Sequence, residues 1–181
     1  MADVTWTFSS TGGSIVVHTG VSGRAARTGH RLTIEMAEWS GSATTRDGLP
    51  VSAQASIVVD SLKVRSGEGG LTPLTGAEKL VARGNALKSL QHDKFPEIRY
   101  QADSFEATPD GFRAHGTLSI HGRGRPHDLD VRVADHGDAR VLNAESTVNQ
   151  KDFGIKPYSL MMGALKVADE VRVEIEIVVE K

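Results

Sequence analysis

The sequence contains no cysteine, which excludes disulfides, thiolate metal ligands and thiol catalysis. It also has no apolar run approaching the ~20 residues that a membrane-spanning helix needs. Residues 1–12 combine neither a basic start nor an apolar stretch, so they do not resemble a signal peptide. We therefore expect a cytoplasmic protein without stable membrane insertion.

The chain also lacks a strong excess of charge of either sign. Its formal net charge of −2 gives no general attraction for nucleic acid, and we expect none as a partner. Aromatic residues make up only 5% of the sequence, whereas glycine occurs 19 times. Many glycines among short alternating runs are typical of β-structure with frequent turns or bent strands. The length of 181 residues fits a single domain, residues 1–181, with its own core.

Alternating apolar and polar residues recur along most of the chain and indicate half-buried strands. The most distinctive case is a hairpin at 116–133, whose two alternating arms flank a turn containing Gly122, Gly124 and Pro126. The final stretch, 171–179, alternates without interruption. Roughly eight such strands predict an antiparallel sandwich or barrel. Closure into a barrel is favoured, because a long final strand with an apolar face would otherwise be an exposed edge.

One segment follows helical periodicity instead. Thr75, with Glu78 three residues later, is the capping-box pattern that opens helices. The predicted apolar stripe consists of Leu80, Gly84, Leu87 and Leu90, with Val81 at its edge. Pro96 closes the segment, because a helix seldom includes the residue before a proline. The patterns together predict an all-β protein with one main helix.

Motifs for catalysis and nucleotide binding are missing from the sequence. It has no G-x-S-x-G elbow, H-E-x-x-H pair, Walker loop or dinucleotide fingerprint. Asp152-Phe153-Gly154 spells a kinase triplet, but that triplet has meaning only beside a catalytic-loop motif, which this chain lacks. We expect no catalytic residues.

Histidines are the remaining candidates for a metal site. His115 and His121 share one face of a strand but lie ~20 Å apart at ~3.3 Å per residue, so they cannot bind one ion. His121 and His127 flank the predicted turn and could meet beside Asp128, although a solvated turn is the simpler interpretation. We expect no metal. The basic turn 121–127 could alternatively bind a phosphate or diphosphate group.

Two further features have both a structural and a functional interpretation. His18 and His30 lie in half-buried strands, so each is either a hydrogen-bonded core histidine or a polar group marking a ligand cavity. The apolar segment 158–165 contains Met161 and Met162, which are either ordinary core or part of a cavity wall, because methionine adapts its shape.

Several motifs match those of a known family. The pattern LSIHG-x-x-x-P-x-x-LDV at 118–131 and the segment 149–155, which includes DFGI, are the most specific. Residues 90–100, residues 167–179 and the opening SIVVHTG…ARTGHRLTI extend the match to nearly the whole chain. These motifs resemble the YceI-like family of polyisoprenoid-binding, lipocalin-like proteins. Gln150 departs from the pattern, which usually has arginine there.

The resemblance implies an eight-stranded antiparallel lipocalin-like β-barrel with a helix packed on it. Such a barrel encloses an apolar tunnel that takes an isoprenoid, such as a polyprenyl chain or a quinone. We therefore expect a non-enzymatic protein that binds, stores or transports a hydrophobic small molecule, with no required cofactor. The sequence leaves open whether the protein forms a homodimer. The residues expected to contact the ligand are His30, Leu32, Ile34, Leu118, Ile120, Phe153, Met161, Met162, Val173 and Ile175.

Two alternative functions remain open. One is an enzyme that acts on an isoprenoid or lipid-like substrate through a cavity histidine, which would need two or more polar side chains meeting inside the cavity. The other is a filled barrel that serves as a structural or interaction module. A cavity below the ~300 Å³ usual for ligand pockets would favour the filled barrel.

Overall fold

The computed structural model describes residues 3–180, which form mostly β-strands and a single α-helix, α1 (Gly76–Ser89). The strands of the main sheet are β1 (Val4–Ser9), β2 (Gly13–His18), β4 (His30–Met36), β5 (Trp39–Arg46), β6 (Leu49–Val58), β7 (Leu62–Gly69), β8 (Glu97–Thr108), β9 (Gly111–Ile120), β10 (Arg123–His136), β11 (Ala139–Asn149) and β14 (Glu170–Glu180). Three short strands form a second sheet: β3 (Val21–Ser22), β12 (Ser159–Leu160) and β13 (Leu165–Val167). The 3₁₀ turns are η1 (Ser10–Gly12), η2 (Ala26–Thr28), η3 (Val59–Ser61), η4 (Gln150–Phe153) and η5 (Met161–Gly163).

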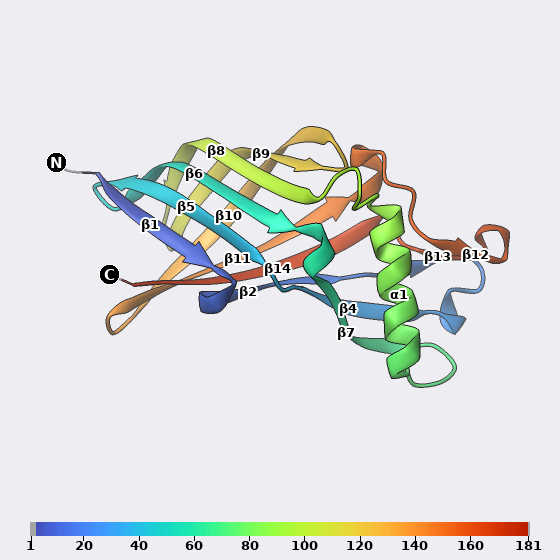
Figure 1. Ribbon diagram of the computed structural model, residues 1–181. Coiled ribbons are helices and arrows are strands. Elements are labelled where there is room, and N and C mark those ends of the chain that lie inside the picture. Colours follow the sequence, from blue (N-terminus) through green and yellow to red (C-terminus); the bar gives the residue numbers. More distant parts are fainter. Residues whose placement is uncertain (1–2, 181) are drawn as a thin grey trace.

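The main sheet is antiparallel and has eleven strands in the order β1-β5-β6-β8-β9-β10-β11-β14-β2-β4-β7. It curls strongly, and α1 lies across one end of it beside β7 (Figure 1). The all-β class with one main helix is therefore confirmed for the described residues.

The predicted number of eight strands is not confirmed, since the main sheet has eleven, and short breaks divide its extended stretches. η1 separates β1 from β2, η3 separates β6 from β7, and residues 37–38 separate β4 from β5. At each break the chain changes neighbours: β5 pairs with β1 and β6, whereas β4 pairs with β2 and β7. Around η3 the strand pattern continues on both sides of the break, so the sequence predicts one strand over 51–64 where the structure has β6 and β7.

The hairpin predicted at 116–133 exists, but its turn is shorter than expected. Ile120 pairs directly with Arg123, so the turn consists of His121 and Gly122 alone. Both have left-handed backbone angles, with φ of 56° and 73°, as two-residue hairpin turns require. The prediction that the turn extends to Gly124 and Pro126 is wrong, because both lie in β10. His127 is consequently a strand residue.

The helix begins as predicted. The Thr75 hydroxyl accepts a hydrogen bond from the Glu78 amide, and a Glu78 carboxylate oxygen accepts one from the Thr75 amide, both 3.1 Å. The predicted stripe is only partly buried: Leu87 is 6% exposed, but Leu80 is 72% and Val81 63% exposed. The face toward the sheet combines apolar, small and polar residues. Those that line the internal cavity are Glu78, Val81, Ala82, Asn85, Ala86 and Ser89, together with the C-cap residue Leu90.

Buried apolar side chains form three clusters on the concave side of the sheet. One surrounds Ile34 and Trp39, a second contains Trp6 and Phe112, and the third contains Phe153. Members of each cluster pack around the space that holds the candidate site.

Candidate ligand cavity

A cavity of about 890 Å³ lies inside the curled sheet. Its wall draws residues from all three core clusters and is predominantly apolar. The volume lies toward the upper end of the ~300–1,000 Å³ that small-molecule pockets span. The described part of the molecule is therefore hollow, which argues against the filled-barrel alternative.

Most of the residues expected from the sequence lie in this wall. They occupy β4, β9 and β14, where alternation directs them to the concave face. The residues placed in the wall are His30, Leu32, Ile34, Leu118, Ile120, Val173 and Ile175. Phe153, Met161 and Met162 lie outside the lining.

Phe153 belongs to the packing behind the wall. It lies in η4, is 3% exposed, and packs with Ile120 and Val148. Its carbonyl oxygen accepts a hydrogen bond from Nδ1 of His121, at 3.0 Å. Phe153 thus fastens η4 to the tip of the β9–β10 hairpin.

Met161 and Met162 point away from the cavity. Their φ angles of 51° and 55° are left-handed, and the tight turn leaves Met161 58% exposed and Met162 fully exposed. Tyr158, Leu160 and Leu165 of the same segment do line the cavity. The segment therefore contributes to the wall through other residues than its methionines.

The two strand histidines differ in position. His30 lines the cavity, and its Nε2 atom hydrogen-bonds the carbonyl of Thr72 at 2.7 Å, tying β4 to the loop before α1. His18 is not in the lining and lies 3.4 Å from Glu174 on the neighbouring strand β14.

A polar cluster in the wall was missed by the sequence reasoning. The Tyr100 hydroxyl of β8 donates to the His127 carbonyl of β10 at 2.7 Å, and His127 Nε2 makes a short hydrogen bond with the Ser146 hydroxyl of β11. All three residues line the cavity. Backbone pairing between β10 and β11 stops at Val131 and Ala144, so the His127–Ser146 contact links the strands where their ladder has ended. One signal could have found His127: it stands at every second position with Leu129 and Val131, whose side chains point inward.

Burial keeps this cluster uncharged near neutral pH. Desolvation lowers the pKa of His127, so its imidazole is neutral at pH 7. Desolvation, together with the negative charge of Asp128, raises the pKa of Tyr100 to about 12. The cavity therefore offers neutral hydrogen-bonding groups within an apolar wall.

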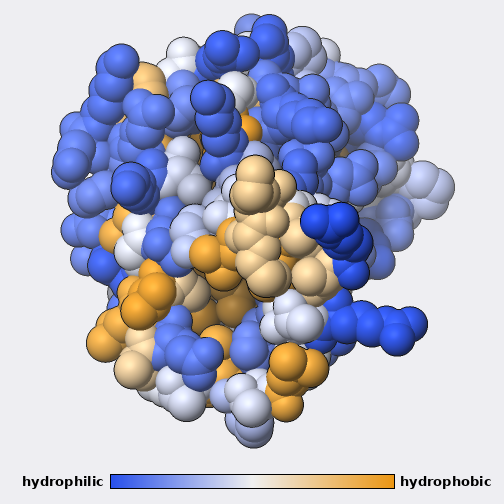
Figure 2. All heavy atoms as spheres, turned by 90° about the vertical axis from the view of Figure 1, so that its right-hand side faces the viewer, coloured by the Kyte–Doolittle hydropathy of each residue, from blue (hydrophilic) through white to orange (hydrophobic). Residues whose placement is uncertain are grey.

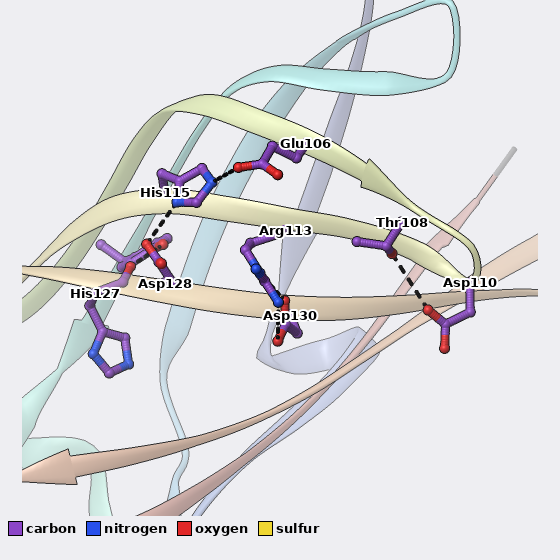
Figure 3. A network of polar contacts seen from close by, with 9 residues as sticks. Glu106, Thr108, Asp110, Arg113, His115, His127, Asp128 and Asp130 are labelled. Atoms are coloured by element: carbon purple, nitrogen blue, oxygen red, sulfur yellow. Dashed lines mark hydrogen bonds and ion pairs between the residues drawn. The ribbon is translucent and has the colours of Figure 1, made fainter.

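A separate ionic network covers the convex face of β8, β9 and β10 (Figure 3). His115 hydrogen-bonds Glu106 at 2.5 Å and Asp128 at 2.9 Å, and the bonds to these two carboxylates raise the pKa of His115. Arg113 pairs with Asp130 at 2.6 Å. Asp128 and His127 point to opposite faces of β10. The metal site considered from the sequence, which needed both residues beside His121, is therefore not formed. Within residues 3–180 no cluster of three metal-ligating side chains is found.

The arginines of the basic turn hold neighbouring segments in place. Arg125 Nε donates to the Asp152 carbonyl at 2.9 Å, and the Arg123 guanidinium lies against Gly154. Gln150 donates from Nε2 to the Ala168 carbonyl at 3.0 Å. These contacts join η4 to the hairpin and to the chain before β14. In the described residues, no helix is long and apolar enough to cross a membrane.

Comparisons with known proteins agree with this architecture. Residues 5–179 match the YceI-like domain. The crystal structure of BcnA from Burkholderia cenocepacia has a TM-score of 0.70 at 15% identity, covering 92% of this chain and 95% of that one. The YCEI protein of Campylobacter jejuni has a TM-score of 0.62 at 15% identity, covering 82% and 84%. A search of curated proteins finds no match. Because the domain match spans almost the whole sequence, the chain belongs to the YceI-like family.

Proposed function

We propose that the protein binds a long apolar molecule of the isoprenoid class, such as a polyprenyl chain or an isoprenoid quinone, inside the cavity and holds it without chemical conversion. The observation that carries this proposal is the cavity of about 890 Å³ with its apolar wall. Burial of an apolar chain contributes about 0.8 kcal/mol per CH₂, so such a wall gives affinity without any reaction.

The neutral polar cluster suits a ligand with one oxygen-bearing end. His127 and Ser146 can exchange their mutual hydrogen bond for one to a carbonyl or hydroxyl oxygen of the ligand. A charged head group is less suitable, because burial already disfavours the charged form of His127. Among isoprenoids, these groups favour a quinone or an alcohol over a free diphosphate at this position.

An enzyme that uses the His127–Ser146 pair is the weaker interpretation. A serine nucleophile needs a histidine that is itself oriented by a third group, and donors for the developing negative charge. Asp128 is adjacent in sequence but lies on the convex face, where it binds His115. Asp128 therefore cannot orient His127 as the acidic member of a triad would. A role for the pair as a polar contact to a bound ligand fits the geometry better.

The sequence supplies a direct probe of binding. Trp6 and Trp39 are its only tryptophans, both are buried, and both line the cavity. A quinone with a long isoprenoid tail is expected to quench their fluorescence in a saturable way. A quinone that carries the same ring but no long tail should bind at least tenfold more weakly, because it buries less apolar surface.

A blocked cavity provides the matched test. Ala144→Phe places a ring in the lining, whereas Ala134→Phe adds the same ring at an exposed position of β10. We expect the first variant to lose at least tenfold in affinity and the second to bind as the unchanged protein does. The proposal is wrong if the long-tailed quinone neither quenches the tryptophans nor is retained by the protein in native mass spectrometry.

A further inference from the structure

Exposed apolar side chains gather at one end of the molecule, around a hollow in its surface (Figure 2). Leu71 is 79% exposed and Leu160 47% exposed, yet both also line the cavity. A side chain that meets both solvent and the cavity must lie at an opening. The cavity therefore opens to solvent between these residues.

Three loops surround this opening, and we call residues 21–29, 70–75 and 156–167 the mouth loops. The first and third share the small sheet β12-β13-β3, and the Ala25 amide donates to the Ala164 carbonyl at 2.8 Å. The second is attached by the hydrogen bond between His30 and Thr72. Residues far apart in the sequence thus form one continuous rim.

The rim carries an apolar side chain that is fully exposed, that of Met162. Met161, Met162 and Gly163 have consecutive left-handed φ angles of 51°, 55° and 89°, a conformation that is unfavourable for methionine. This turn holds the Met162 side chain fully exposed. Exposed apolar groups that gather around an opening mark a surface that binds something.

The charge of the rim indicates what binds there. The mouth loops contain Arg24, Arg27, Lys156 and Lys166 but no aspartate or glutamate, although the whole chain has a net charge of −2. Within residues 3–180, the first three of these cations form no ion pair, while Lys166 lies 3.8 Å from Asp169. The carboxylate of Glu78 also lines the cavity, but it is engaged by the capping box. An apolar rim bordered by unpaired cations is complementary to an anionic lipid surface.

We propose that the mouth loops dock on an anionic phospholipid bilayer. Leu71, Leu160 and Met162 enter the interfacial layer, while Arg24, Arg27 and Lys156 approach the lipid phosphates. Docking places the cavity opening against the acyl chains, so an apolar ligand passes between bilayer and cavity without crossing water. This interaction is distinct from ligand binding inside the cavity, and it requires no ligand to be present.

Cosedimentation of the ligand-free protein with vesicles tests the proposal. We expect binding to vesicles of equal parts phosphatidylcholine and phosphatidylglycerol, much weaker binding to phosphatidylcholine alone, and weakening by salt. Replacement of Arg24, Arg27 and Lys156 by glutamine should reduce binding roughly fivefold per cation, about a hundredfold in total. Arg132→Gln on the convex face of β10 is the matched control and should bind unchanged.

Because the sequence has no cysteine, a single introduced cysteine can carry a label that reports which part of the protein enters the bilayer. Met162→Cys carrying an environment-sensitive fluorophore should shift its emission to the blue with the anionic vesicles. The same label on Val4→Cys, an exposed position in β1 near the chain start at the opposite end in Figure 1, should not shift.

Absence of binding to the anionic vesicles, or a blue shift at Val4 rather than at Met162, overturns the docking proposal. Neither outcome affects the quinone titration, which contains no vesicles. Conversely, vesicle binding with no quinone quenching would support docking and reject the proposed cavity ligand.

Discussion

Gly116→Ala is a sharp test of how the polar cluster of the cavity is built. Tyr100 reaches the carbonyl of His127 on β10 by lying across Gly116 of β9. A Cβ atom at position 116 would lie 2.5 Å from Cζ and 2.6 Å from the hydroxyl oxygen of Tyr100, and 2.7 Å from the carbonyl oxygen of Gln101. These separations are too short for carbon beside either group, so the tyrosine ring must move away.

The expected cost combines two effects. Overpacking in a well-packed region costs about 1–3 kcal/mol. Displacement of the ring also breaks the 2.7 Å hydrogen bond to His127, which contributes about 0.5–1.5 kcal/mol. The sum is a loss of about 1.5–4.5 kcal/mol in the free energy of unfolding, or roughly 3–18 °C in Tm for a chain of this size. Tyr100→Phe isolates the hydrogen bond and should cost only about 1 kcal/mol.

Urea denaturation of a double-mutant cycle measures the coupling. In a Tyr100→Ala background the ring is gone, so Gly116→Ala should cost at least 1 kcal/mol less than in the unchanged protein. A residual cost is expected from the backbone oxygen of Gln101. If Gly116→Ala costs less than about 0.5 kcal/mol, or costs the same in both backgrounds, the proposed arrangement of Tyr100 over β9 is incorrect.

Other predictions concern the helix and the histidines. Gly84→Ala should stabilise the protein by about 0.5–1 kcal/mol in urea denaturation, since a Cβ there meets nothing within 4 Å and alanine favours helix; a loss would contradict this. Thr75→Ala should cost about 1 kcal/mol, or roughly 2–4 °C by calorimetry, because it removes the hydroxyl that caps α1; an unchanged Tm would refute it. By NMR, His115 should titrate above ~6.5, because its carboxylate partners stabilise the charged form, and His127 below it, because burial disfavours that form. The contribution of His115 to folding stability is then full below its ordinary pKa and is lost as pH rises through the raised pKa. The contribution of His127 is full above its ordinary pKa and is lost as pH falls through the lowered pKa. The reverse order of titration for the two histidines would refute both predictions.

Local periodicity predicted the features that depend on neighbouring residues. Alternation identified the strands around His30, Leu118 and Val173, because the pleat places every second side chain on one face. The capping box identified the start of α1 because it too is a local feature: Thr75 and Glu78 are three residues apart and hydrogen-bond each other directly. The break at η3, between β6 and β7, was not predictable in this way, because it depends on which distant strand lies alongside.

Pro126 shows why the extent of the central turn was misjudged. Proline is usually excluded from strands with two neighbours, so the sequence placed it in a turn. In the structure β10 pairs with β11 only from Val131 onward, and Pro126 lies in the part that pairs with β9 alone. This part of β10 is locally an edge, where proline is tolerated. The same early end of the ladder leaves His127 free to bond Ser146, so one missed feature explains the other.

The hollow interior depends on the size of the inward side chains, which hydropathy does not measure. Six of the seven expected residues that line the cavity were found because they are apolar, the exception being His30, but a filled barrel would show the same alternation. What keeps this sheet hollow is the presence of small residues at inward positions of several strands. Those that line the cavity include Ala43, Ala53, Ala55, Ala114 and Ala144.

The scarcity of aromatic residues, 5% of the sequence, has the same consequence. Rings do line the cavity, among them those of Trp6, Trp39 and Phe112, but further rings at the alanine positions would fill the space that a chain-like ligand needs. The low aromatic content and the inward alanines are both visible in the sequence. Side-chain volume at the inward positions, rather than apolar character, therefore distinguishes a container from a packed barrel.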